Sequence, residues 1–136
     1  MRVKLALLAD SANVSREGKL NLLGIFDAIF ARELPTSHPH MHLVLRFEAT
    51  PADAGTALSI EVQLVAPAGD MLLRIPGTMQ VPPVPSGMTA GVDHVLALAN
   101  VAFAQPGDYA FRVLIDGRLA ATVPLRVDTL PAGPTH

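Results

Sequence analysis

The 136-residue chain contains no cysteine and no tryptophan, and aromatic residues make up only 4% of it. Without cysteine there is no disulfide, no thiolate nucleophile and no thiolate-bound zinc. The ten Lys and Arg residues are scattered along the sequence. They form no basic patch, and the few aromatic side chains form no stacking platform for bases. The composition therefore predicts that nucleic acid is not a partner.

Charge is also scarce. Charged residues make up 16% of the chain and hydrophobic residues 50%, with a net charge of −2, whereas an average soluble domain is about 25% charged. No stretch reaches the roughly 18 consecutive apolar residues of a membrane span, so we expect no membrane partner. A small domain with so few charges leaves apolar side chains on its surface, and such surfaces usually bind a partner. We predict a homo-oligomer or a protein partner.

The beginning of the chain resembles a secretory signal only superficially. Arg2 and Lys4 supply positive charge, but the apolar residues 5–9 end at Asp10. A signal peptide needs an apolar region of roughly 7–15 residues. We therefore interpret residues 3–9 as a first strand and predict a cytoplasmic location.

Several segments alternate between apolar and polar residues, which is the two-residue period of a β-strand. In residues 41–49, for example, Leu43, Leu45 and Phe47 fall on one face. The longest apolar run, residues 18–31, is predicted to be a long strand that bends at Gly24 and serves two sheets. Strands are predicted at residues 3–9, 18–31, 41–49, 57–65, 71–81 with a break at 76, 92–103, 109–115 and 118–127.

Turn signals separate these segments. Asp116 and Gly117 form a two-residue hairpin signal, and Pro124 marks the last strand as an edge strand. Residues 81–91, rich in proline and glycine, predict an exposed crossing between sheets. The short strands and the absence of helical periodicity predict an all-β fold, an antiparallel immunoglobulin-like β-sandwich of seven to eight strands. A single domain is expected over residues 1–128, with a flexible tail at 129–136.

Two motifs carry a resemblance to a known family. Residues 10–27 read DSANVSREGKLNLLGIFD, and residues 106–111 read PGDYAF, followed by Asp116-Gly117. The first motif resembles the opening of a family of small, uncharacterised bacterial β-sandwich proteins that is catalogued as a domain of unknown function. The resemblance implies a β-sandwich and a bacterial origin, and it brings no established activity.

One cluster of side chains has the pattern of a metal site. His38, His40 and His42 share one face if the segment is extended, and imidazole suits Zn, Ni or Cu. Alternate side chains on a strand are about 7 Å apart, so a shared ion would require a local bend, which Pro39 could supply. The alternative is a solvated segment that happens to carry histidines.

No catalytic motif is present: there is no nucleophile elbow, phosphate-binding glycine loop or His-Glu-x-x-His sequence. We predict a non-catalytic β-sandwich protein that requires no cofactor and acts as a structural or protein-interaction module that self-associates. The alternative function is a metal-binding module built on the three histidines. A third hypothesis is a pocket for a small ligand between the sheets, although the sequence identifies no residues or substrate for it.

Overall fold

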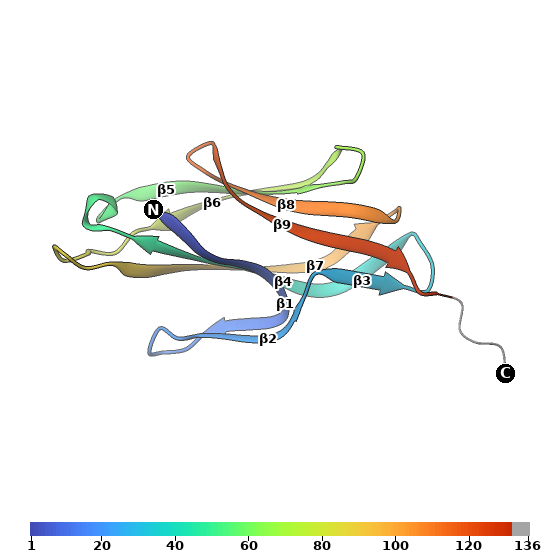
Figure 1. Cartoon of the computed structure of the whole chain (residues 1–136), viewed down its shortest axis with the longest axis horizontal. Helices are drawn as coiled ribbons and strands as arrows, with labels where there is room; N and C mark the ends of the chain where they lie inside the picture. Colours follow the sequence, from blue (N-terminus) through green and yellow to red (C-terminus); the bar gives the residue numbers. More distant parts are fainter. Residues whose placement is uncertain (132–136) are drawn as a thin grey trace.

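The computed structural model describes residues 1–131, which contain nine β-strands in two sheets (Figure 1). The only helical element in this part of the chain is a 3-10 turn, Pro51–Asp53. The described residues therefore contain no helix that is long and apolar enough to cross a membrane. The strands are β1 (Arg2–Val14), β2 (Leu20–Phe26), β3 (Ala28–Ala31), β4 (Thr36–Ala49), β5 (Ala57–Val65), β6 (Met71–Gln80), β7 (Ala90–Phe103), β8 (Gly107–Ile115) and β9 (Arg118–Thr129).

The two sheets face each other across one hydrophobic core. The first sheet has the order β2-β1-β4-β7 and is antiparallel throughout. The second has the order β3-β9-β8-β5-β6 and is antiparallel except for the parallel pair β3–β9. The all-β, two-sheet prediction is therefore confirmed.

The core follows the predicted alternation. Along β4, Leu43, Leu45 and Phe47 are buried between the sheets, because successive side chains of a strand point to opposite faces. The second sheet contributes alternate residues of β5, β8 and β9 in the same way. These are Ile60, Val62, Leu64, Tyr109, Phe111, Val113, Val123, Leu125 and Val127.

The predicted count of seven to eight strands is too low, because the apolar run at residues 18–31 is two strands. β2 pairs with β1 in the first sheet, and β3 pairs with β9 in the second. The chain changes sheet at Asp27, whose carbonyl accepts a hydrogen bond from the Arg126 N–H at 2.9 Å. The run therefore serves both sheets, as predicted, but the change comes three residues after Gly24.

Several predicted boundaries are wrong. β1 continues to Val14, beyond the predicted end of the first strand at residue 9, and β4 begins at Thr36, before the predicted start at residue 41. Pro124 does not lie on an edge strand, because β9 lies between β3 and β8. However, β3 pairs with β9 only from Arg126 onward, so β3 does not reach the part of β9 that contains Pro124. The predicted tail at 129–136 overlaps β9 at Thr129, and residues 132–136 lie outside the described part.

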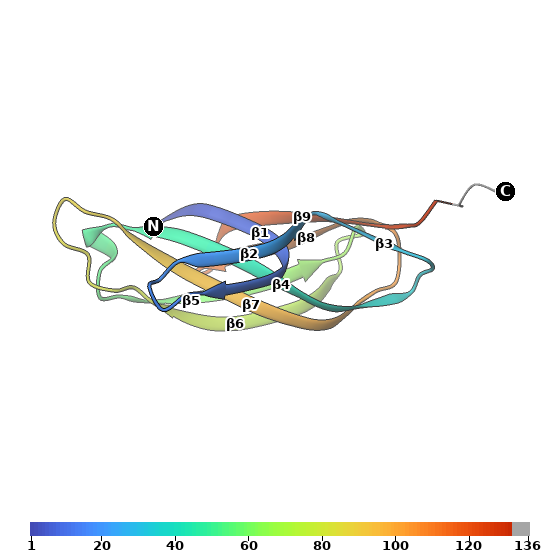
Figure 2. The same ribbon diagram turned by 90° about the horizontal axis from the view of Figure 1, so that it is seen from below.

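The distal parts of β1 and β2 form a hairpin that leaves the sandwich. We call residues 10–25 the hairpin arm. Figure 1 shows the arm below the two layers, and Figure 2, which is seen from below, shows it in front of the first sheet. Its tip closes with a turn in which the Ser15 carbonyl accepts from the Gly18 N–H at 2.9 Å.

Candidate functional site

The hairpin arm turns away from the sheet at Asp10 and Gly24, which lie between the cross-strand pairs Ala9–Ile25 and Ser11–Leu23. Gly24 has a φ of 72°, and a Cβ atom there would collide with the Asp10 carboxylate. Only glycine fits this position, because the backbone there is left-handed and the Asp10 carboxylate occupies the space that a Cβ atom would need. The Nδ1 atom of His42 lies 3.2 Å from the Asp10 carbonyl oxygen, so β4 also contacts the arm at its hinge.

The arm covers part of the first sheet's outer face. Val44 points outward from the sheet, opposite the core-facing neighbours Leu43 and Leu45, yet its exposed fraction is 0%. Next to it, the Arg46 guanidinium binds both oxygens of Asp93 at 2.6 and 2.9 Å and approaches the Gly18 carbonyl oxygen at the arm tip, 3.5 Å away. The Asp93 hydrogen bonds raise the pKa of Arg46. Arg46 is thus a charged link between sheet and arm.

The opposite side of the arm presents apolar side chains to solvent. Leu23 and Ile25 are 72% and 63% exposed, and Phe30 on β3 is 57% exposed. We call these three residues the apolar strip. Ala12 and Leu22, which pair with each other on the other face of the arm, are half-buried. The fold thus leaves these three side chains exposed while it half-buries Ala12 and Leu22.

The three predicted metal ligands lie on β4, but their rings have different neighbours. His38 packs against Phe26 with ring centroids 5.9 Å apart, His40 is exposed, and His42 contacts Asp10 as described above. The pKa of His38 is lowered, and burial is the largest cause. The charge of Asp10 acts against this shift by raising the pKa, and the charge of His40 adds to it. Within residues 1–131 there is no group of three or more His, Asp or Glu side chains arranged to hold a metal ion. Metal binding by His38, His40 and His42 stays a prediction, which elemental analysis of the native protein and of His40→Ala would test.

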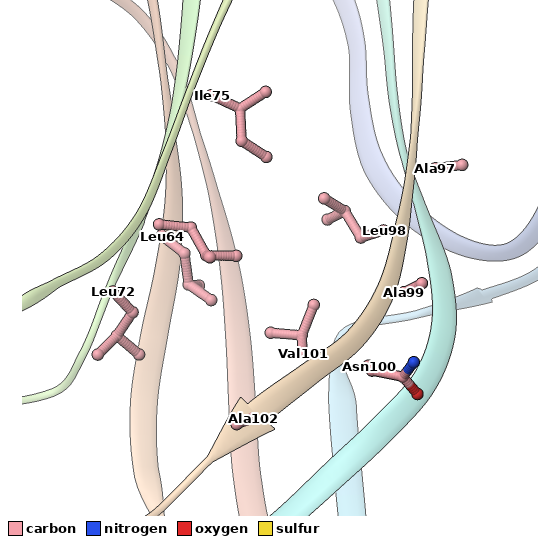
Figure 3. A pocket seen from close by; sticks show the side chains of 10 residues that line it. Leu64, Leu72, Ile75, Ala97, Leu98, Ala99, Asn100, Val101 and Ala102 are labelled. Carbon is pink, nitrogen blue, oxygen red and sulfur yellow. The ribbon is translucent and has the colours of Figure 1, made fainter.

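An apolar cleft opens between the two sheets on the side where β6 and β7 end their respective sheets. It has a volume of about 490 Å³. Leu64, Leu98 and Val101 form its buried floor, while Leu72 and Ile75 of β6 form one rim (Figure 3). Asn100 also lines the cleft, but Figure 3 shows its side chain turned away from Leu64 and Leu72. The sequence suggested a pocket between the sheets without identifying these residues, because which two strands border the open side depends on strand order.

Comparison with solved structures shows where this fold occurs. The chain is similar to the alkylpurine DNA glycosylase AlkC of Pseudomonas fluorescens, in a structure bound to DNA containing an abasic site analog. The TM-score is 0.51 at 11% identity, and the match covers 93% of this chain and 30% of the glycosylase chain. The chain therefore spans less than a third of that enzyme, and at this identity the likeness shows the fold alone. No curated protein matches the chain.

This finding corrects our partner prediction. We predicted a homo-oligomer or protein partner and excluded nucleic acid, but the matched protein is bound to DNA, so that prediction is wrong as it stands. Its basis was composition, and composition does not tell which side chains a fold gathers in one place. The DNA in that structure is bound by the glycosylase, and the comparison does not show that this chain binds DNA.

The family comparison covers almost the whole chain. A family model described as "Family of unknown function (DUF6941)" matches residues 4–128. This range includes all nine strands apart from the first two residues of β1 and the last residue of β9. It also includes the hairpin arm, the apolar strip and the cleft. The chain belongs to this family of unknown function, DUF6941.

Proposed function

We propose that the protein is a non-catalytic binding module in which the sandwich is a rigid support and the apolar strip is the contact surface. The observation that carries this proposal is the exposure of Leu23, Ile25 and Phe30 along one short segment. Large aliphatic and aromatic side chains exposed together are typical of interaction sites. Leu23 and Ile25 lie on β2 of the first sheet and Phe30 lies on β3 of the second, so the strip follows the chain as it passes from one sheet to the other.

The use of the carboxylates supports a non-catalytic role. Asp93 pairs with Arg46, and Glu61 accepts hydrogen bonds from Gln63 and Arg74 at 2.6 and 2.7 Å. Asp53 caps the 3-10 turn by accepting from the Thr50 N–H at 2.9 Å, and this hydrogen bond is the largest of the causes that lower its pKa. Each of these groups is engaged in holding the fold.

Site-specific photo-crosslinking in cells of the native host would test the contact surface. We expect a benzoylphenylalanine residue at Leu23 or Phe30 to give a covalent adduct. The same residue at Thr78, an exposed position of β6 at the opposite end of the second sheet from β3, should give none. Treatment of the adduct with nuclease or protease then assigns the partner to nucleic acid or protein. Equal yields at Leu23 and Thr78, or no adduct at either strip position, would overturn the proposal.

We also infer that the sandwich is of the immunoglobulin-like kind. The support is Tyr109, whose hydroxyl donates to the Gln105 carbonyl at 2.6 Å and accepts from the Gln105 N–H at 3.3 Å. Such a tyrosine corner at the start of a late strand is typical of immunoglobulin-like sandwiches. Bacterial origin and a cytoplasmic location stay predictions.

A further inference from the structure

We propose that the apolar cleft between β6 and β7 binds an elongated, uncharged aliphatic molecule. This site is separate from the apolar strip, which lies on the hairpin arm and β3. The volume of about 490 Å³ falls within the roughly 300–1,000 Å³ typical of small-molecule sites. Its walls are leucine, isoleucine, valine and alanine apart from Asn100, whose side chain turns away (Figure 3). A site without inward polar groups selects an apolar ligand, because a buried polar group would lack a hydrogen-bond partner.

The shape of the site indicates an elongated ligand. A second hollow of about 360 Å³ shares Leu72 and Ala102 with the cleft and extends it toward Gln105 and Tyr109 at the end of the sandwich. Asp70 lines this second hollow. Its carboxylate would repel an anionic head group, so the charge at this end favours a neutral alcohol, ester or amide over a free carboxylate.

The two bordering strands favour a small molecule over an added peptide strand. β6 and β7 are both at the ends of their sheets, and an open edge is otherwise a template for strand pairing. However, Pro76 removes an N–H donor from the middle of β6, and Asn100 in β7 has a φ of 53°. A proline and a left-handed residue interrupt the regular row of donors and acceptors that an extended peptide requires. The side-chain cleft between the edges remains open.

The test is a two-dimensional amide NMR titration of the full chain with 1-octanol, 1-decanol and decanoate. We expect saturable shifts confined to β6, β7 and the adjoining end of the second sheet, with tighter binding for the longer alcohol. Decanoate should bind more weakly than decanol because of Asp70, and Asp70→Asn should narrow that difference.

The variant Leu72→Asp places a charge on the cleft rim and should weaken binding of decanol by about tenfold or more. Leu72 is 43% exposed, so the fold should tolerate the change. The matched control is Leu119→Asp, at a leucine of similar exposure (53%) in the hairpin of β8 and β9. Shifts that do not saturate, shifts centred on the hairpin arm, or equal effects of the two variants would overturn the proposal. Pairing of a peptide strand would instead appear as new amide protection along β6 or β7 in the absence of alcohol. These results are independent of crosslinking at Leu23.

Discussion

Two hairpins of the chain, that of β8 and β9 and the hairpin arm, are used by the fold in opposite ways. In the hairpin of β8 and β9, alternate side chains of both strands are buried in the core, among them Phe111 and Leu125. In the hairpin arm of β1 and β2, Leu23 and Ile25 are exposed, and the arm depends on its hinge and on contacts with the outer face of the first sheet. The difference indicates that burial stabilises the hairpin of β8 and β9, whereas local backbone geometry stabilises the hairpin arm. The side chains of the arm therefore remain available to solvent.

The largest expected effect is the loss of stability when a buried side chain is removed from the hairpin of β8 and β9, compared with removal of an exposed side chain from the arm. Phe111→Ala, at a fully buried side chain, should lower the free energy of unfolding by about 3–5 kcal/mol. Leu23→Ala on the arm should change it by less than about 0.5 kcal/mol, because the side chain is already in water. Urea unfolding followed by circular dichroism measures both values. Similar losses for the two variants would contradict the distinction.

The hinge of the arm should be the next most sensitive position. Gly24→Ala is expected to cost about 2–4 kcal/mol, since the new methyl group adds a collision with Asp10 to the strain of a left-handed backbone. Gly18→Ala at the arm tip is the control: its φ is 81°, but a Cβ atom there meets nothing within 4 Å. This variant should cost only about 1–2 kcal/mol.

A double variant separates the two contributions at the hinge. Asp10→Ala in the Gly24→Ala background removes the carboxylate that collides with the new methyl group. We expect it to recover the collision part of the loss and to leave the backbone part. If Gly18→Ala were as damaging as Gly24→Ala, the hinge would have no special constraint.

Hydrogen bonds should show the same contrast between the hairpins on a smaller scale. Tyr109→Phe keeps the edge-to-face contact with Phe103 but leaves the Gln105 carbonyl without its donor, at a cost of about 1–2 kcal/mol. In the arm, Asn21→Ala removes an exposed side-chain hydrogen bond of 2.9 Å to Asn13. It should cost at most about 0.5 kcal/mol. Chemical denaturation of the two variants under the same conditions provides the comparison.

The same contrast explains how far the sequence could predict the structure. The segment from Tyr109 to Val127 alternates apolar and polar residues around Asp116-Gly117, and there the predicted strands and turn are confirmed. In the arm, no strand was predicted between residues 9 and 18, although β1 continues to Val14, because Ser11 and Asn13 face solvent on a strand that lies outside the core. Polarity alone does not distinguish such a strand from a loop.

The candidate sites were less predictable than the fold. The apolar strip depends on which face of the arm packs against the first sheet, and the cleft depends on β6 and β7 ending the two sheets. Both are consequences of strand order, which no local pattern contains. The histidines were visible as a pattern in residues 38–42, but their neighbours Phe26 and Asp10 come from other strands.

The smallest expected effect concerns pH at the root of the arm, where His38 packs against Phe26. Burial is the main cause that lowers the pKa of His38 in the folded state, so the unfolded chain, with a His pKa of about 6.5, binds the proton more readily. The free energy of unfolding should therefore fall as pH decreases from about 7.5 through 6.5 toward the lowered folded pKa, and level off below it. Burial of His94 lowers its pKa and acts in the same direction.

Urea unfolding of the wild type, His38→Leu and His94→Leu at a pH of about 8 and about 5.5 separates the two histidines. His38→Leu should lose part of the pH dependence and His94→Leu another part. The charges of Asp10 and His40 act on the pKa of His38 in opposite directions, Asp10 raising it and His40 lowering it, so His40→Ala should make the pH dependence slightly weaker. A slope that is unchanged in His38→Leu would mean that the packing of this ring on Phe26 does not disfavour its charged form, and that the root of the arm is more hydrated than the contact indicates.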